Sequence, residues 1–216
     1  MTLWTSWDGT PDLGCNFMMQ NCLMHGGVLN PNRWAAGSSP PYYPLWLIHD
    51  SAFDATSISF YDAAGGATNV TAFDYNAFLT GADRTDPSGA HDVIVTNFNW
   101  QVGPLGNYYQ PTNSPLINHG STNANFLGLF HFTITTNLVS GLQIKETNSI
   151  VDISYHYVAT DANGKPIDTD SDGTPDYIED ANGNGTVDSG ETDWQSATDL
   201  GLKVIITRPR DGSTLP

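Results

Sequence analysis

Three stretches of one form decide the fold: Gln20-Asn21-Cys22-Leu23-Met24, His49-Asp50-Ser51-Ala52-Phe53 and Asp74-Tyr75-Asn76-Ala77-Phe78. Each has two polar residues, a small or polar residue, an aliphatic residue and a large apolar residue. Their last residues are 29 and 25 positions apart, and a fourth unit is expected 20 positions later, at Asn97-Phe98. This period is typical of coils that stack into a solenoid and bury their large apolar residues between neighbours. The alternative is a chance likeness among Asn-rich turns.

The composition favours β-structure. The 21 Gly and 13 Pro of the 216 residues interrupt any long helical period, and short runs of Val, Ile, Thr, Phe and Tyr lie between them. The apolar fraction of 39%, with six Trp, nine Tyr and nine Phe, is enough for a sizeable core. The length leaves room for one domain and a smaller appendage. We therefore predict a mainly β chain.

Two later stretches resemble a known family. They run from Pro111 to Ser121 and from Ser149 to Tyr157, and contain Ser-Pro-Leu-Ile-Asn-His-Gly and Val-Asp-Ile-Ser-Tyr. They resemble the closing turns of pectate-lyase-like right-handed parallel β-helices of bacterial surface proteins, with Asn118 for the usual Asp and Ser154 for the usual Gly. The resemblance implies that residues 1–158 are the last coils and the C-terminal cap of a truncated β-helix. Such a truncated helix leaves a sheet edge that invites stacking between chains.

The stretch from Asp168 to Glu191 has the spacing of two calcium loops. Counted from Asp168 and again from Asp180, oxygen-bearing side chains occupy positions 1, 3, 5, 9 and 12, with Gly at position 6. In such a loop, alternate side chains and the carbonyl of position 7 point at one ion, and the final Glu binds through both oxygens. We expect two calcium ions, held by Asp168, Asp170, Asp172, Thr174, Asp176 and Glu179, and by Asp180, Asn182, Asn184, Thr186, Asp188 and Glu191.

The first of these loops should bind more tightly, because it has five carboxylates and the second has three. Which loop owns Asp180 stays open. The alternative for the whole stretch is an acidic, Gly-rich disordered linker.

The two loops are not ordinary EF-hands. They abut without an intervening residue, and Pro175 at position 8 has no N–H with which to join a partner loop. They resemble the Asp-x-Asp-x-Asp-Gly repeats of thrombospondin type-3 and related bacterial surface proteins. This resemblance implies a calcium-binding spacer over residues 159–200. Residues 201–216, which include the alternating run Leu202–Pro209, resemble the opening strand of an immunoglobulin-like repeat or a linker.

The formal net charge of −16 is concentrated in this segment, because residues 161–199 hold eleven acids and one base. Such a surface repels phosphate, so we expect no nucleic-acid partner. No apolar run approaches the ~20 residues of a membrane helix, so we expect no membrane insertion. Calcium loops, few Lys and many Asn, Thr, Gly and Ser indicate an extracellular or cell-surface location. Because residues 1–8 are unlike a signal peptide, we expect the chain to be a piece of a longer protein.

Several residues are candidates for chemistry in a β-helix enzyme. Arg33 and Arg84 are the candidate bases of a polysaccharide lyase, although Asp83-Arg84-x-Asp86 also reads as a turn with a local ion pair. A glycoside hydrolase would need paired carboxylates, for which the candidates are Asp50, Asp54 and Asp74. The alternative is that these three are polar caps and turn residues. His119, His131 and His156 are either ordinary strand histidines or the ligands of a transition-metal site.

Aromatic and cysteine residues leave two further questions. Nine rings beside Gly, Pro and Asn either stack on sugars or seal the core: Trp4, Trp7, Trp34, Trp46, Trp100, Tyr42, Tyr43, Tyr108 and Tyr109. Cys15 and Cys22 either form one local bridge or act as small buried apolar groups.

These patterns together favour a calcium-stabilised, non-catalytic module of a secreted or cell-surface bacterial protein. Its role would be adhesion, carbohydrate contact or assembly, with polysaccharide or neighbouring copies of itself as partners. The alternatives are a polysaccharide lyase or glycoside hydrolase of the β-helix type, and a self-assembling extracellular fibre subunit.

Overall fold

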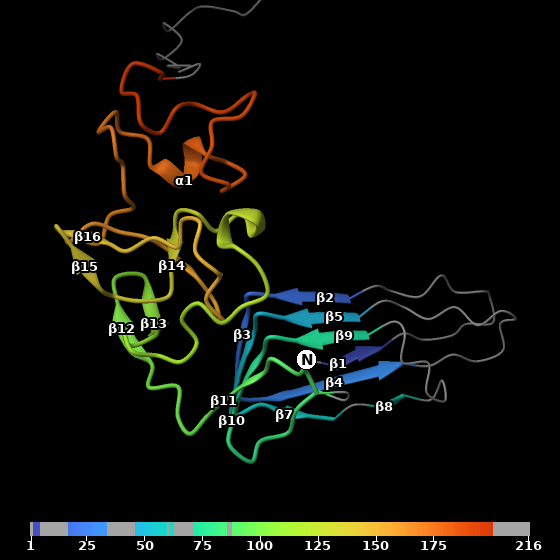
Figure 1. The fold of residues 1–216 in the computed structure, drawn as a ribbon. Coiled ribbons are helices and arrows are strands. Elements are labelled where there is room, and N and C mark those ends of the chain that lie inside the picture. The colour runs from blue at the N-terminus through green and yellow to red at the C-terminus, as the bar shows by residue number, and fades with distance from the viewer. Residues whose placement is uncertain are drawn as a thin grey trace, which may run out of the picture.

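The computed structural model describes residues 2–4, 17–33, 46–59, 61–62, 71–85 and 88–200. The chain is mainly β, and its N-terminal half forms three sheets of parallel strands (Figure 1). The first sheet contains β2 (Phe17–Gln20), β5 (Trp46–His49) and β9 (Thr71–Asp74). The second contains β3 (Leu23–His25), β6 (Ala52–Asp54), β10 (Ala77–Leu79) and β11 (Val93–Val95). The third contains β1 (Thr2–Trp4), β4 (Val28–Arg33), β7 (Ser57–Ile58) and β8 (Tyr61–Asp62).

The three repeated stretches lie in the register that their sequences predict. Met24 pairs with Phe53, and Phe53 pairs with Phe78 in the next strand of the same sheet. The rings of Phe53 and Phe78 are stacked with centroids 5.1 Å apart, and both side chains are buried. Each such ring contributes about 1.5–3 kcal/mol by leaving water. Successive stretches are therefore successive coils, an arrangement compatible with a β-helix.

The chain turns the same corner in every coil. The second residue of each stretch has a positive φ: 47° at Asn21, 56° at Asp50 and 57° at Tyr75. Few residues other than Gly adopt this conformation, and Asn and Asp are enriched among them. The corner explains why a polar residue occupies this position in two of the three coils.

The small or polar residue that follows the corner builds a hydrogen-bond ladder between coils. The Cys22 N–H donates to Ser51 Oγ at 3.2 Å, and the Ser51 N–H donates to Asn76 Oδ1 at 3.2 Å. Asn76 Nδ2 in turn donates to the Ile48 carbonyl at 2.8 Å. These bonds satisfy backbone groups at the corner and join each coil to the next.

The prediction of a fourth unit at Asn97-Phe98 is wrong. In the structure Val93 pairs with Ala77 and Ile94 with Phe78, so the fourth strand comes earlier in the chain. The Asp92 side chain replaces the ladder residue by accepting the Asn76 N–H at 3.0 Å. Phe98 is buried in the core but lies outside any strand.

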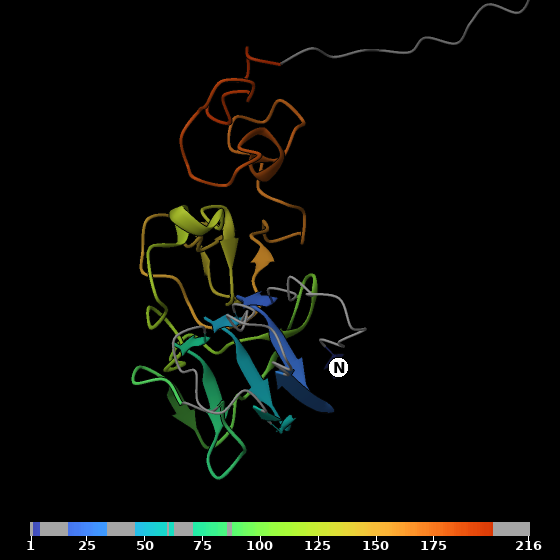
Figure 2. The same ribbon diagram turned by 90° about the vertical axis from the view of Figure 1, so that its right-hand side faces the viewer.

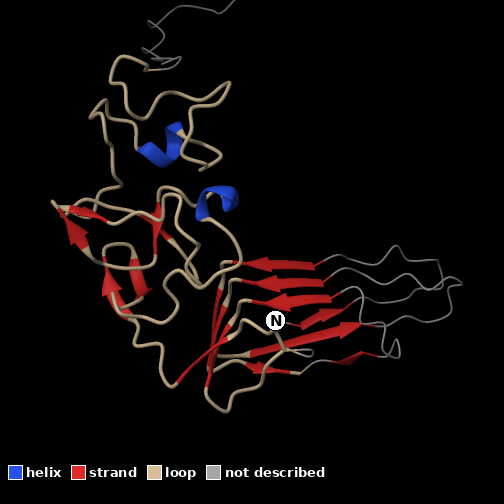
Figure 3. Ribbon diagram, in the orientation of Figure 1, coloured by secondary structure: helices blue, strands red, loops and turns tan. Residues whose placement is uncertain are grey.

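Residues 96–167, here called the cap, stand beside the coils and are built from short antiparallel pairs (Figures 1 and 3). They form two hairpins, one further strand pair and a short 3-10 helix: β12 (Gln101–Gly103) with β13 (Gly106–Tyr109), β15 (Leu138–Val139) with β16 (Leu142–Gln143), β14 (Phe132–Thr133) with β17 (Tyr157–Val158), and η2 (Ala124–Leu127).

The two stretches expected to be closing turns lie side by side. The Gly120 N–H donates to the Val151 carbonyl at 2.8 Å, and the Ile153 N–H donates to the Leu116 carbonyl at 3.0 Å. Both stretches reach the coil corner at Asp50, whose carbonyl accepts the Ser154 N–H at 3.0 Å. Residues 159–167 continue the hydrogen bonding of the cap, for example from the Ala159 N–H to the His131 carbonyl at 3.0 Å.

Residues 168–200, here called the loop segment, lie beyond the cap on the side away from the coils (Figures 1 and 2). Their regular structure is one turn of helix, α1 (Asp176–Glu179). The terminal strand predicted within 201–216 lies outside the described residues. No helix in the described part of the chain is both long and apolar enough to span a bilayer.

Candidate metal centre

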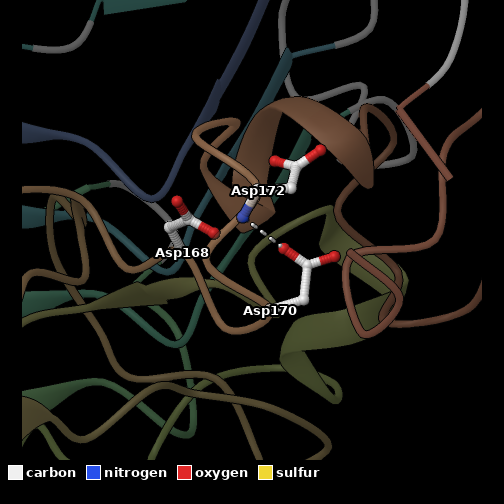
Figure 4. Close-up of side chains that lie close together, drawn as sticks. All are labelled: Asp168, Asp170 and Asp172. Carbon is white, nitrogen blue, oxygen red and sulfur yellow. Dashed lines mark hydrogen bonds between the residues drawn. The ribbon is translucent and has the colours of Figure 1, made fainter. Parts of the chain in front are cut away.

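The first loop, Asp168–Glu179, is folded by backbone N–H groups that donate to its own carboxylates. Gly173 donates to Asp168 Oδ2 at 3.0 Å, and Asp172 donates to Asp170 Oδ1 at 3.1 Å. Thr174 donates to Asp172 Oδ1 at 2.6 Å. These bonds curl the chain, so that the carboxylates at positions 1, 3 and 5 lie around one space (Figure 4).

The second loop, Asp180–Glu191, repeats the same bonds at the same positions. Gly185 donates to Asp180 Oδ2 at 2.6 Å, Asn184 to Asn182 Oδ1 at 3.0 Å and Thr186 to Asn184 Oδ1 at 2.7 Å. The two twelve-residue stretches are therefore one structural motif used twice.

The backbone bends recur as well. Position 4 has φ 63° at Ser171 and 65° at Gly183, and position 6 has φ 98° at Gly173 and 81° at Gly185. Glycine at position 6 adopts this conformation without the steric cost of a Cβ.

Three carboxylates of the first loop could hold a metal ion. Asp168, Asp170 and Asp172 each offer an oxygen, and these atoms all lie within 4.8 Å of one another (Figure 4). Asp168 Oδ1 and Asp170 Oδ2 are buried and have no hydrogen-bond partner. Burial, followed by the charges of Asp172 and Asp168, raises the pKa of Asp170.

Glu179, at position 12, is a further buried acid of the same loop, and its charge interacts with those of Asp170 and Asp172. Its side chain is 2% exposed, Oε1 accepts the Thr192 hydroxyl at 2.9 Å, and Oε2 has no partner. Burial, followed by the charges of Asp172, Asp170 and Asp176, raises the pKa of Glu179. Anionic oxygens held together without donors destabilise one another, and a hard divalent cation removes that cost. The residues present therefore fit calcium.

Asp176, at position 9 of the first loop, has its oxygens engaged elsewhere. Oδ1 accepts the Thr169 N–H at 2.7 Å, while Oδ2 accepts the Thr169 hydroxyl at 2.7 Å and Lys145 Nζ at 3.0 Å. Lys145 belongs to the cap. The structure thus directs this carboxylate toward the cap.

The ligands expected in the second loop converge on one another. Asp188 Oδ2 accepts Asn182 Nδ2 at 2.8 Å and Asn184 Nδ2 at 2.7 Å, and these bonds, with the Thr186 hydroxyl, lower the pKa of Asp188. Glu191 accepts the N–H groups of Asn182 and Asp188 at 3.1 and 2.9 Å. The second loop satisfies its carboxylates with its own donors, unlike the first.

Asp180 joins the second loop to the cap. Besides the Gly185 N–H, it accepts the Asn184 N–H at 3.1 Å and His131 Nε2 at 2.9 Å. Within the loop segment, its side chain accepts hydrogen bonds from the second loop.

The carboxylates considered for a hydrolase each have a separate structural partner. Asp50, fully buried, accepts the N–H and hydroxyl of Ser121, both at 2.7 Å, and lies 2.7 Å from His49 Nδ1. Asp54 Oδ2 accepts Trp100 Nε1 at 2.7 Å and lies 2.8 Å from His25 Nδ1. Asp74 Oδ2 lies 2.7 Å from His91 Nδ1.

The candidate lyase base Arg84 forms a local ion pair, as the alternative interpretation predicts. Its partner is Asp92. Its Nη2 donates to Asp92 Oδ2 at 2.6 Å and to the Gly89 carbonyl at 3.2 Å. Asp83 instead accepts the Ser57 hydroxyl at 2.9 Å. Asp86 and the side chain of Arg33 lie outside the described residues.

The three histidines expected in the cap do not share a partner. His119 Nδ1 lies 2.7 Å from the Ile117 carbonyl, His131 binds Asp180, and His156 Nε2 lies 3.1 Å from Glu146 Oε1. Their nitrogen atoms are engaged at three separate places, so they do not form a transition-metal site in this structure.

The described aromatic residues seal the cap. Tyr109 is fully buried and stacks on Tyr157 with ring centroids 4.2 Å apart. Trp100 is half-buried, with Phe98 stacked on it at 5.0 Å and Tyr108 at its edge. The other six candidate side chains lie outside the described residues: Trp4, Trp7, Trp34, Trp46, Tyr42 and Tyr43.

Cys22 is a free, half-buried thiol whose pKa is raised by burial. Its Sγ lies 3.1 Å from the Gln20 carbonyl. Cys15 lies outside the described residues.

A buried acid cluster in the cap could not be predicted from the sequence pattern. Glu146 and Asp152 line a groove of about 370 Å³, and buried His156 lies 3.1 Å from Glu146. Burial, followed by the charge and hydrogen bond of Glu146, raises the pKa of Asp152 to about 8. Asp152 Oδ1 also accepts the Asn118 N–H at 2.7 Å, and Glu146 Oε2 accepts the Ser149 hydroxyl at 3.1 Å.

Comparison with known protein families, with curated proteins and with solved structures gives no match for this chain.

Proposed function

We propose that the loop segment binds calcium, and that the chain is a calcium-stabilised, non-catalytic module of a secreted or cell-surface protein. One observation carries this proposal: Asp168 Oδ1 and Asp170 Oδ2 are buried without a partner in a cluster of three carboxylates, and Glu179 Oε2, at position 12 of the same loop, is also buried without a partner. Structural carboxylates in proteins are ordinarily paired or hydrogen-bonded. A loop that leaves several buried carboxylate oxygens without a partner has the character of a cation site.

The chemistry of these donors favours calcium over other metals. The cluster offers carboxylate oxygens without a thiol or imidazole, which suits hard cations and not zinc or copper. Calcium accepts six to eight oxygens in a flexible geometry, whereas magnesium requires a near-ideal octahedron. The second loop supplies two carboxamides among its ligands, so we propose that it binds a second ion more weakly.

A scaffolding role is supported by the contacts of the remaining polar residues. The acids and the arginine considered for catalysis are each held by a neighbouring group of the fold, as Asp50 is by Ser121 and Arg84 by Asp92. The stacked parallel strands and the resemblance of the loops to calcium-binding spacers support adhesion, carbohydrate contact or assembly. Polysaccharide and neighbouring copies of the chain are the partners that we propose.

Calorimetric titration of the calcium-free chain tests the metal site. We expect calcium to bind more tightly than magnesium and, at about 100 times its Kd, to stabilise the fold by about 2.7 kcal/mol. That corresponds to roughly 5–10 °C in Tm for a chain of this size. Asp170→Asn should weaken binding at the first loop, whereas Asp161→Asn, which removes a carboxylate from a turn of the cap, should not.

Two results would contradict the proposal. One is a calorimetric trace without heat of binding and a Tm that chelation leaves unchanged. The other is equal loss of calcium affinity in the Asp170 and Asp161 variants, because that would indicate a diffuse effect of net charge.

A further inference from the structure

The loop segment and the cap meet at a buried polar junction, formed by His131 and Lys145 of the cap with Asp176, Asp180 and Trp194 of the segment. Lys145 Nζ donates to Asp176 Oδ2 at 3.0 Å and to His131 Nδ1 at 3.2 Å. Because Nδ1 accepts this bond, Nε2 of the same ring carries the proton that it donates to Asp180 at 2.9 Å. The chain of bonds therefore links two acids of the segment through one lysine and one histidine of the cap.

The histidine and the two acids of this junction are buried. His131 and Asp176 are each 2% exposed and Asp180 is 1% exposed. Trp194 covers it, with its ring centroid 5.1 Å from that of His131 and 4.9 Å from Lys145 Nζ. Loss of one member of a buried charge pair leaves its partner uncompensated, which is far more destabilising than loss of a surface pair.

The backbones also fit closely beside the junction. The Phe130 N–H donates to the Gly183 carbonyl at 3.0 Å, and the Asp176 N–H donates to the Ile167 carbonyl at 3.0 Å. A Cβ on Gly183 would lie 2.1 Å from the Gly128 carbonyl oxygen. The loop segment is thus docked on the cap through its own loop residues.

The acids at position 9 of the two loops, Asp176 and Asp188, have different hydrogen-bond partners. Asp188, in the second loop, accepts bonds from Asn182 and Asn184 and so faces its own loop. Asp176, in the first loop, accepts bonds from Thr169 of its own loop and also from Lys145 of the cap. The unpartnered oxygens of the first loop belong to other residues, namely Asp168, Asp170 and Glu179.

We propose that Asp176 is an anchor of the loop segment and not a ligand of the first ion. The ion is held by Asp168, Asp170, Asp172 and Glu179, while Asp176 holds Lys145 and thereby fixes the segment on the cap. Cap and loop segment then form one unit, whose attachment exists before calcium binds. The assignment of ligands rests on the proposed calcium function; the anchor does not.

A comparison of variants in calorimetry and thermal unfolding separates the two roles. Asp170→Asn should weaken calcium binding at the first loop about tenfold or more and should not lower the Tm in calcium-free buffer. Asp176→Asn should leave this affinity within about threefold and should lower the Tm both with and without calcium. Lys145→Met should behave like Asp176→Asn, and the double variant should be no less stable than the worse single variant, because the two side chains act as one pair.

Lys165→Met, at an exposed lysine of the cap, should change neither quantity. If Asp176→Asn does not fold, Thr169→Val, which removes only one donor to Asp176, serves in the same comparison. The inference is overturned if Asp176→Asn weakens calcium binding as much as Asp170→Asn, or if the Asp176 and Lys145 effects on Tm in calcium-free buffer add independently. A wild-type chain that binds no calcium would instead overturn the proposed function, and the Tm comparison would still test the anchor.

Discussion

The acid cluster of the cap makes stability depend on pH near neutrality. Asp152 is buried against Glu146, and burial of His156 lowers the pKa of that ring to about 4. His156 Nδ1 donates to the Ser154 carbonyl at 3.1 Å, so a neutral ring presents a lone pair to the Glu146 carboxyl, 3.1 Å away. A proton must lie between these two atoms, which agrees with the raised pKa of Glu146.

The direction of the pH dependence follows from which state binds more protons. The folded chain keeps Asp152 protonated up to about pH 8, whereas the unfolded chain ionises it near 3.8. Stability therefore falls as pH rises through this window. His156 has the opposite effect between about pH 4 and 6.5, because there the unfolded chain binds the extra proton. The two slopes oppose each other below pH 6.5, and above it only the decline remains.

The expected decline is about 2 kcal/mol between pH 6.5 and pH 8. One pKa unit corresponds to 1.36 kcal/mol, and about 1.5 units separate the two values. Urea unfolding in calcium-free buffer at several pH values measures it. Asp152→Asn should abolish the slope, since a carboxamide does not ionise, whereas Asp83→Asn, at an exposed carboxylate, should retain it.

Two observations would refute this reasoning. The wild-type slope between pH 6.5 and 8 could be absent, in which case Asp152 is ionised in the folded chain. Alternatively, the slope could persist unchanged in Asp152→Asn, in which case another group is responsible.

Two further predictions concern the fold. Asn76→Ala should cost about 3 kcal/mol in urea unfolding, because it leaves the buried Ser51 N–H and Ile48 carbonyl without the ladder; a loss no larger than that of exposed Asn148→Ala would contradict the ladder. Gly185→Ala should lower the Tm more than Gly190→Ala, because both positions have positive φ but only at Gly185 would a Cβ meet an atom, the Phe130 ring at 2.2 Å. Equal Tm values for these two variants would show that the loop does not pack on Phe130.

The coil register could be predicted because one short pattern recurs at every corner. The pattern records local needs: a residue that tolerates positive φ, a hydrogen-bonding ladder residue and a large apolar residue for the stack. The fourth coil was misplaced because Ala90 and His91 precede its ladder residue Asp92, without a polar first residue or a positive φ at the second, and because Ile94 follows Phe78 by only 16 positions.

The candidate site was predictable only where its residues are neighbours in the chain. Spacing alone identified the Asp168, Asp170 and Asp172 cluster. Spacing could not show that Asp176 turns to the cap, because its partner Lys145 is 31 residues earlier and is brought there by tertiary packing. The same applies to Glu146, Asp152 and His156, which meet only after the short turns of the cap pack together.

The corner at Asp50 has a consequence for the order of assembly during synthesis. Its fully buried carboxylate is covered by Ser121, which leaves the ribosome 71 residues later. Until then we expect the nascent coils to hold a solvated anion at this edge, with His49 as a close neighbour. Residues 118–154 would then pack on this corner and cover the carboxylate. A chain that ends before Ser121 should therefore be cleaved more readily by proteases at this edge of the coils.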